Sequence, residues 1–230
     1  MRSIILIPFI AILFLGCMAR VSHTFEKIDP NNPVVKHKHF TMIAPDETPI
    51  KWEWIRTNYY DNEVTVSHYL QHFNKDKKPT EGIWKGYSLQ ILTYSAENEK
   101  GRDKKLQYYL KALESIKNRD EQYLKEEYLE WTTWKKRGIV SAEYGSVNKH
   151  PAIVADTHTK YRDTDKYSRE YFFLTYSKTG KLKAYIITIS VDIDKPNADD
   201  PELLVEYSFE DMLKRSQRSL DSFVASDEDF

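Results

Sequence analysis

The residue best placed for covalent chemistry in this chain is its one cysteine, Cys17, which comes directly after Gly16. Arg2 and an apolar run from Ile4 to Leu15 precede it. A short basic segment followed by a short apolar segment is the order found in a secretory signal peptide. The run is too short to span a bilayer, which takes ~20 apolar residues. Cleavage after Gly16 would place the thiol on the first residue of the mature chain.

The residues Leu13-Phe14-Leu15-Gly16-Cys17 resemble the lipobox of bacterial lipoproteins, although Phe14 stands where that motif more often has leucine. In such proteins the thiol accepts a diacylglyceryl group, and the small residue before it admits the signal peptidase. Several acyl chains, palmitate among them, give a stable membrane anchor at ~0.8 kcal/mol per buried methylene. The resemblance implies that Cys17 is lipidated and that the chain faces the periplasm. Because Met18 rather than aspartate follows, the outer membrane is favoured over the inner one.

Two other interpretations of this segment stay open: a signal peptide whose cysteine is incidental, or a short signal anchor. Cys17 is the only cysteine among 230 residues and falls where a lipobox needs it, which favours lipidation.

His68 and His72 are four residues apart, a spacing that could bind zinc on a helix. Tyr69 follows the first histidine, so the glutamate of an HExxH motif is missing. Val64 and Val66 favour a strand instead, on which the two rings lie too far apart for one ion. The second histidine motif, His37-Lys38-His39, could bind a metal loosely, but it is interpreted as a solvated loop beside a tether.

The acidic groups are interpreted as solvated surface. Asp192, Asp194, Asp199 and Asp200 lack the turn glycine of a calcium loop, and Glu126-Glu127 lie in a charge-rich helix. There is no GxSxG elbow for a nucleophilic serine. We therefore predict no catalytic residue, no metal site and no cofactor.

The composition argues against two further kinds of function, nucleic-acid binding and phosphate binding by glycine-rich loops. With 34 Lys+Arg against 35 Asp+Glu, the net charge of −1 gives no electrostatic reason to expect nucleic-acid binding. Only 7 glycines are present, without GxGxxG or GxxxxGK[ST], so phosphate-binding loops are not indicated.

The elements that position these residues follow from periodicity. Strands are expected over 40–44, 50–60, 64–73, 82–94, 139–144, 152–160, 169–177 and 182–193, with a hairpin turn at 178–181. Helices are expected over 103–117, over 121 to about 127 with Gly138 as a stop, and over 203–220 behind a capping box at Ser208–Asp211. Strands in runs predict an α+β fold: an antiparallel sheet flanked by helices, with a closing C-terminal helix.

The domain organisation predicted from these elements has four parts. Residues 1–16 form a lipoprotein signal peptide, 17–38 the lipidated cysteine and a tether, 39–221 a single α+β domain, and 222–230 a flexible acidic tail.

Several local sequences resemble the PsbP/Mog1-like group, which includes the DcrB-type bacterial lipoproteins. They are Phe40 to Pro45 followed by Trp52, Lys149 to Ala152, Tyr171 to Leu174, Gly180, Ala184 to Ile187, and Tyr207-Ser208-Phe209. His150 departs from the group's usual glycine, and the segment 57–94 is longer than its pattern. The resemblance implies a sheet flanked by helices and mostly non-catalytic binding or assembly roles. It implies no active site.

Aromatic residues are abundant, with 16 Tyr and 5 Trp. If Tyr59 and Tyr60 share a strand, one of them lies outside the core, where it would suit a protein partner; sheet packing is the alternative. We predict a membrane-anchored periplasmic lipoprotein with a non-catalytic protein-binding or assembly role in the cell envelope. The alternatives are an immunity or exclusion lipoprotein that neutralises a toxin or conjugation partner, and a periplasmic hydrolase or metal-binding enzyme.

Overall fold

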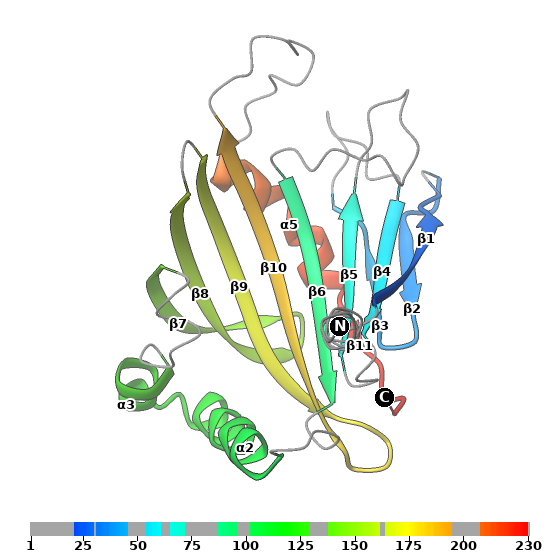
Figure 1. Ribbon diagram of the computed structural model, residues 1–230. Helices are drawn as coiled ribbons and strands as arrows, with labels where there is room; N and C mark the ends of the chain where they lie inside the picture. Colours follow the sequence, from blue (N-terminus) through cyan, green and yellow to red (C-terminus); the bar gives the residue numbers. More distant parts are fainter. Residues whose placement is uncertain are drawn as a thin grey trace, which may run out of the picture.

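The computed structural model describes residues 21–29, 31–45, 54–60, 65–71, 87–95, 102–128, 138–161, 164–194 and 208–229 (Figure 1). In chain order its elements are β1 (Val21–Lys27), β2 (Val34–His37), β3 (Phe40–Ile43), β4 (Trp54–Tyr60), β5 (Thr65–Gln71), β6 (Tyr87–Ser95), α2 (Arg102–Asn118), α3 (Glu121–Tyr123), the π-helical turn η2 (Leu124–Tyr128), β7 (Ile139–Val147), β8 (His150–Tyr161), β9 (Thr164–Tyr176), β10 (Leu182–Asp194), α5 (Phe209–Ser222) and β11 (Val224–Ala225).

The strands form two antiparallel sheets. The larger sheet has eight strands in the order β1-β4-β5-β6-β10-β9-β8-β7, and the smaller has three in the order β11-β3-β2. All pairings between the described strands are antiparallel. The expected α+β class, with an antiparallel sheet, flanking helices and a C-terminal helix on the sheet, is confirmed.

The central strands β9 and β10 bury both of their faces, because successive side chains point to opposite sides of a strand. Phe173 and Tyr185 are register partners on one face, with ring centroids 5.1 Å apart. Phe172 and Ile186 are the next pair and lie on the other face. The apolar runs Tyr171–Leu174 of β9 and Ala184–Ile187 of β10 therefore serve two cores rather than one.

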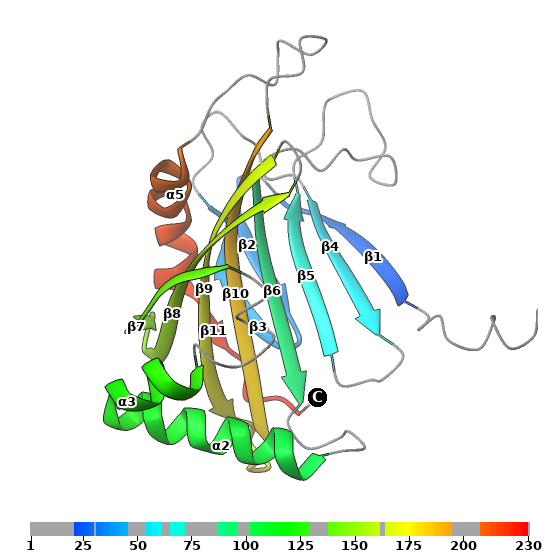
Figure 2. The ribbon, with the colours of Figure 1, turned by 60° about the vertical axis from the view of Figure 1, so that its left-hand side comes forward.

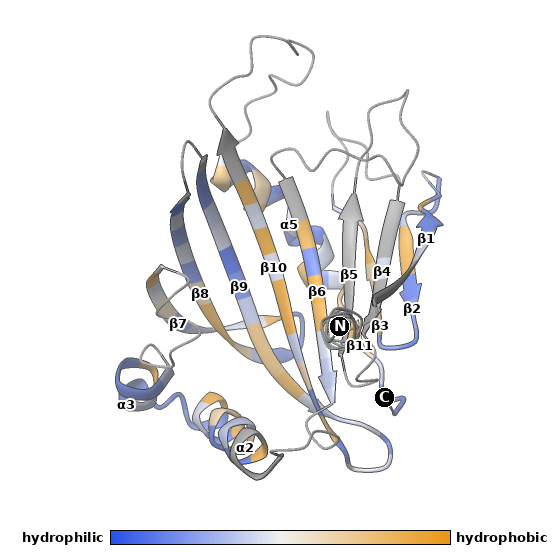
Figure 3. Ribbon diagram, viewed as in Figure 1, coloured by the Kyte–Doolittle hydropathy of each residue, from blue (hydrophilic) through white to orange (hydrophobic). Residues whose placement is uncertain are grey.

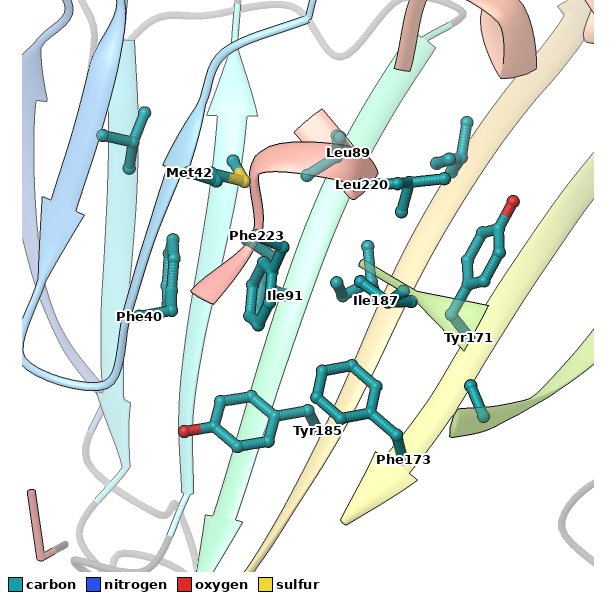
Figure 4. Close-up of a cluster of buried hydrophobic side chains, with 14 of the residues drawn as sticks. Phe40, Met42, Leu89, Ile91, Tyr171, Phe173, Tyr185, Ile187, Leu220 and Phe223 are labelled. Carbon is teal, nitrogen blue, oxygen red and sulfur yellow. The ribbon is translucent and has the colours of Figure 1, made fainter. Parts of the chain in front are cut away.

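The first core lies between the large sheet, the small sheet and α5. Phe40, Phe173, Tyr185 and Phe223 form its aromatic centre, with Phe40 and Phe223 stacked at 5.5 Å (Figure 4). Burying side chains of this size is the dominant stabilising contribution, at about 1.5–3 kcal/mol each.

One face of helix α5 contributes apolar residues to the first core. Helix α2 lies on the opposite side of the large sheet (Figure 2). Helix α5 begins with the expected capping box, in which Ser208 Oγ accepts from Asp211 N and the Asp211 carboxylate accepts from Ser208 N. Met212 and Leu220 are buried, and Leu213 packs half-buried. Its predicted docking on the sheet is confirmed.

The second core lies under α2, α3 and η2. Tyr109 and Tyr128 pack on Phe172, with centroids 6.1 and 6.3 Å from it. The expected second helix thus spans α3 and η2. Gly138 lies before β7 at a φ of +68°, where a Cβ atom would meet the His158 carbonyl oxygen at 2.3 Å, so the close approach to β8 requires glycine.

The structure differs from the predicted tether and tail. Residues 21–27 form the edge strand β1 on β4, and residues 34–37 form β2. Asn31 and Asn32 lie between β1 and β2, with an isolated bridge between Asp29 and Asn32. The tail likewise begins with the buried Phe223 and continues as β11 on the edge of β3. Short polar edge strands carry a weak sequence signal, because they are specified by the strand they pair with.

No helix of the described residues is long and apolar enough to cross a membrane.

Candidate contact surface

The most concentrated group of functional side chains lies on β8 and β9, on the face that also packs against α5. Its residues are Asp156, His158, Asp165, Tyr167 and Arg169, and together they are called the β8–β9 surface below. The register pairs Asp156 with Arg169 and His158 with Tyr167. On β8 and β9, the apolar core of this face ends at the neighbouring register pair, Val154 and Tyr171. Figure 3 shows the change to hydrophilic residues along both strands.

An ion pair forms the side of the β8–β9 surface next to the core. Arg169 donates from Nε to Asp156 Oδ1 at 2.6 Å and from Nη2 to Asp156 Oδ2 at 2.7 Å, a bidentate geometry. The hydrogen bonds to Asp156 raise the pKa of Arg169 above its usual value. The two side chains are 29% and 30% exposed, so the pair is partly shielded from water and has a fixed orientation.

An aromatic stack extends from this pair toward α5. The His158 and Tyr167 rings are stacked with centroids 4.3 Å apart and planes within 4°. Tyr167 in turn lies 6.2 Å from Phe209, the first residue of α5. His158 Nε2 is 3.0 Å from Asp165 Oδ1, which fixes the outer edge of the histidine ring. The sheet and the helix start together hold these rings in place.

The β8–β9 surface combines an aromatic stack with an ion pair. Within the described part of the chain, the His158 ring is hydrogen-bonded to Asp165 and no hydroxyl or thiol is held against it as a nucleophile. Tyrosine and arginine are among the side chains enriched at protein interfaces. Because Asp156 already pairs with Arg169, this arginine does not need an acidic ligand.

The structure places the sequence-predicted residues in several different regions. Cys17, His72, Asp199, Asp200 and Trp52 lie outside the described residues. His68 lies in β5, as the strand interpretation predicts. Asp192 and Asp194 end β10, and Glu126 and Glu127 are exposed on η2. Among the described residues, no group of three or more His, Cys, Asp or Glu side chains could hold a metal ion.

The interpretation of His37-Lys38-His39 as a solvated loop is wrong. These residues join β2 to β3, and His39 is only 3% exposed. Its carbonyl accepts from Tyr185 Oη and from Ser226 N, each at 2.8 Å. Burial, followed by the nearby Lys183, lowers the pKa of His39 to about 3, so the ring is neutral. No local pattern marks this burial, because it comes from β10 and the C-terminal segment.

The β8–β9 surface was missed in the sequence for a similar reason. Its five residues are spread over positions 156–169 and read as ordinary polar positions in two strands. Only the register, which sets Asp156 opposite Arg169, brings them together. A usable signal was the alternation of polar residues at 165, 167 and 169 directly before the apolar 171 and 173.

Comparisons with known proteins give distant similarities. No family model matches the sequence, and no curated protein is significantly similar to it. A solved structure from Bacteroides thetaiotaomicron VPI-5482 has 14% sequence identity and a TM-score of 0.38, covering 81% of this chain and 45% of the other. LpqN of Mycobacterium tuberculosis, described as involved in cell envelope biogenesis, has 8% identity and a TM-score of 0.30, covering 92% of this chain and 87% of LpqN.

This chain spans less than half of the Bacteroides protein. Both TM-scores are low, so neither similarity supports an inference about function. The resemblance to the PsbP/Mog1-like group stays a prediction.

Proposed function

We propose that this chain is a lipoprotein of the bacterial cell envelope whose domain binds another protein and has no catalytic role. The observation that carries the proposal is the position of Cys17: the only thiol of the chain directly follows a small residue at the end of a short apolar run. Acylation of that thiol holds the domain at the periplasmic side of a membrane. The missing aspartate at position 18 favours the outer membrane.

The anchor is tested with Cys17→Ser in cells that express the full chain. Wild type should incorporate labelled palmitate and sediment with membranes, whereas the variant should do neither, because serine lacks the thiol that accepts the diacylglyceryl group. Gly16→Ala, which keeps a small residue before the cut, is the matched control and should still be labelled. A Cys17→Ser protein that stays in the membrane fraction without label would establish a signal anchor in place of the lipid.

Protein binding is supported by the β8–β9 surface. It presents an ordered aromatic stack beside an ion pair that is already internally neutralised. A partner surface with an aromatic or aliphatic anchor and a few hydrogen-bonding groups fits it, because such a partner would bury the Tyr167 ring without leaving Arg169 unpaired.

This role is tested by photo-crosslinking in intact envelopes. A photoreactive phenylalanine analogue is placed at Tyr167, and the control carries it at Glu114, which is exposed on α2. We expect one specific protein adduct at position 167, absent at 114 and weakened severalfold by Arg169→Ala. The same adducts at both positions, or none at 167, would argue against this surface.

A further inference from the structure

The chain between the lipid and the domain is short. Three residues lie between Cys17 and Val21, the first residue of β1, so four Cα-to-Cα steps join the two. An extended chain spans at most ~3.3–3.6 Å per residue, so the Cα atom of Val21 lies within about 14 Å of that of Cys17. If the thiol carries acyl chains, then β1 begins close to the lipid headgroups.

The register shows which end of the large sheet this is. Val21 pairs with Tyr60 at the end of β4, and Thr65 at the start of β5 pairs with Tyr94 near the end of β6. Tyr94 pairs with Ala184 near the start of β10. The start of β1 therefore lies at the same end of the sheet as the turn between β9 and β10 (Figure 2).

The side chains at this end are typical of a lipid–water boundary. Tyr176 is 51% exposed at the end of β9, and Lys178 and Lys181 are exposed in the turn that follows. A tyrosine ring with a polar tip and lysines with apolar stems are amphipathic, and both side chains are favoured at the headgroup level.

The acidic C-terminal segment does not oppose this arrangement, because it is held against the turn. Glu228 Oε2 accepts from Lys178 Nζ at 2.8 Å, and Asp229 Oδ1 accepts from Thr179 Oγ1 at 2.6 Å. Its charges are therefore partly compensated locally rather than presented alone to anionic lipids.

We infer that the sheet end bearing Tyr176, Lys178 and Lys181 rests on the surface of the membrane that holds the acyl chains of Cys17. The inference rests on the proposed lipidation. β9 runs for 13 residues from the opposite end, which at ~3.3 Å per residue is about 40 Å. The β8–β9 surface, near the start of β9, is then directed away from the membrane toward soluble or opposing envelope proteins.

The orientation is tested with two matched variants of the full lipidated protein, Lys181→Cys and Lys160→Cys. Both replace an exposed lysine, one in the β9–β10 turn and one near the end of β8. Since Cys17 is the only native cysteine and is acylated, the new thiol is the only one that reacts with a fluorophore. The labelled proteins are reconstituted in phosphatidylethanolamine–phosphatidylglycerol vesicles that carry nitroxide-labelled headgroups, with Thr179→Cys as a second probe of the turn.

Fluorescence at positions 181 and 179 should be quenched severalfold more than at position 160. Equal quenching at both ends, or stronger quenching at 160, would overturn the orientation while leaving the anchor intact. If the fluorophores in the turn were not quenched, the turn would be covered by protein rather than by lipid. That result would also overturn the inference. Palmitate incorporation is measured on the same samples, so a failure of lipidation itself is recognised separately and removes the basis of both proposals.

Discussion

At the residue scale, burial determines the charge of two histidines beside β3. Burial lowers the pKa of His39 to about 3, with a smaller contribution from the positive charge of Lys183. Burial likewise lowers the pKa of His37 to about 4, with a smaller contribution from Lys38. In the unfolded chain both titrate near 6.5. Between the folded and unfolded pKa values the unfolded chain binds more protons, so stability falls as the pH falls through this window.

For the buried His39 we therefore predict a loss of stability of about 2–3 kcal/mol from pH 6.5 to 4.5, with a smaller contribution of the same sign from the more exposed His37. His39→Gln removes one titrating group and should flatten the dependence, whatever its effect at pH 7.5. The measurement is the free energy of unfolding in urea at several pH values for wild type and variant. Parallel curves for the two proteins would show that His39 is not held neutral.

At the element scale, α5 is fixed by its apolar face and by its cap. Met212 is 1% exposed in the first core, whereas Lys214 is exposed on the other side of the helix. Met212→Ala should cost about 2–4 kcal/mol, because it leaves a cavity beside the sheet. Lys214→Ala should stay within about 0.5 kcal/mol. The half-buried Leu213 should fall between them. Thermal unfolding of all three variants tests this order, and equal melting temperatures would contradict the packing.

The cap of α5 gives a separate prediction. Ser208 Oγ accepts from Asp211 N at 3.0 Å, and Asp211 Oδ2 accepts from Ser208 N at 3.3 Å. Ser208→Ala should destabilise the protein by about 1 kcal/mol, because a backbone donor of the first turn loses its partner. Ser208→Asp keeps an accepting oxygen and should restore most of that loss in the same urea titration. An alanine variant as stable as wild type would show that the cap contributes nothing.

At the scale of the whole molecule, the C-terminal segment closes the first core. Phe223 is fully buried among Phe40, Phe173 and Tyr185. Beyond it, Lys183 Nζ donates to the carbonyls of Ser226 at 2.9 Å and Glu228 at 2.7 Å. The segment therefore joins the small sheet to the β9–β10 hairpin.

A chain that ends at Ser222 should consequently lose about 3–5 kcal/mol, the usual cost of removing a buried phenylalanine, together with β11. A chain that ends at Ser226 keeps Phe223 and β11 and should lose far less. Urea unfolding of both truncations against wild type makes the comparison. If the shorter chain matched wild type, the segment would be the flexible tail that composition alone suggests.

The fold class could be predicted from the sequence, and the sequence also predicts one residue for covalent anchoring, Cys17. Periodicity located the strands of the large sheet except β1, and both long helices, since alternation and helical spacing are local properties. The Ser208–Asp211 cap was readable because a capping box depends on residues three apart. The lipid anchor at Cys17 stays a prediction, which rests on a linear motif and needs no tertiary structure.

Only the tertiary structure decided which distant residues meet. The pairing of β8 with β9 brings Asp156 opposite Arg169, and the pairing of β1 with β4 turns an expected tether into an edge strand. His39 is buried by β10 and the C-terminal segment, neither of which is near it in sequence. Register and burial are set by contacts between elements far apart in the chain, so no local pattern encodes them.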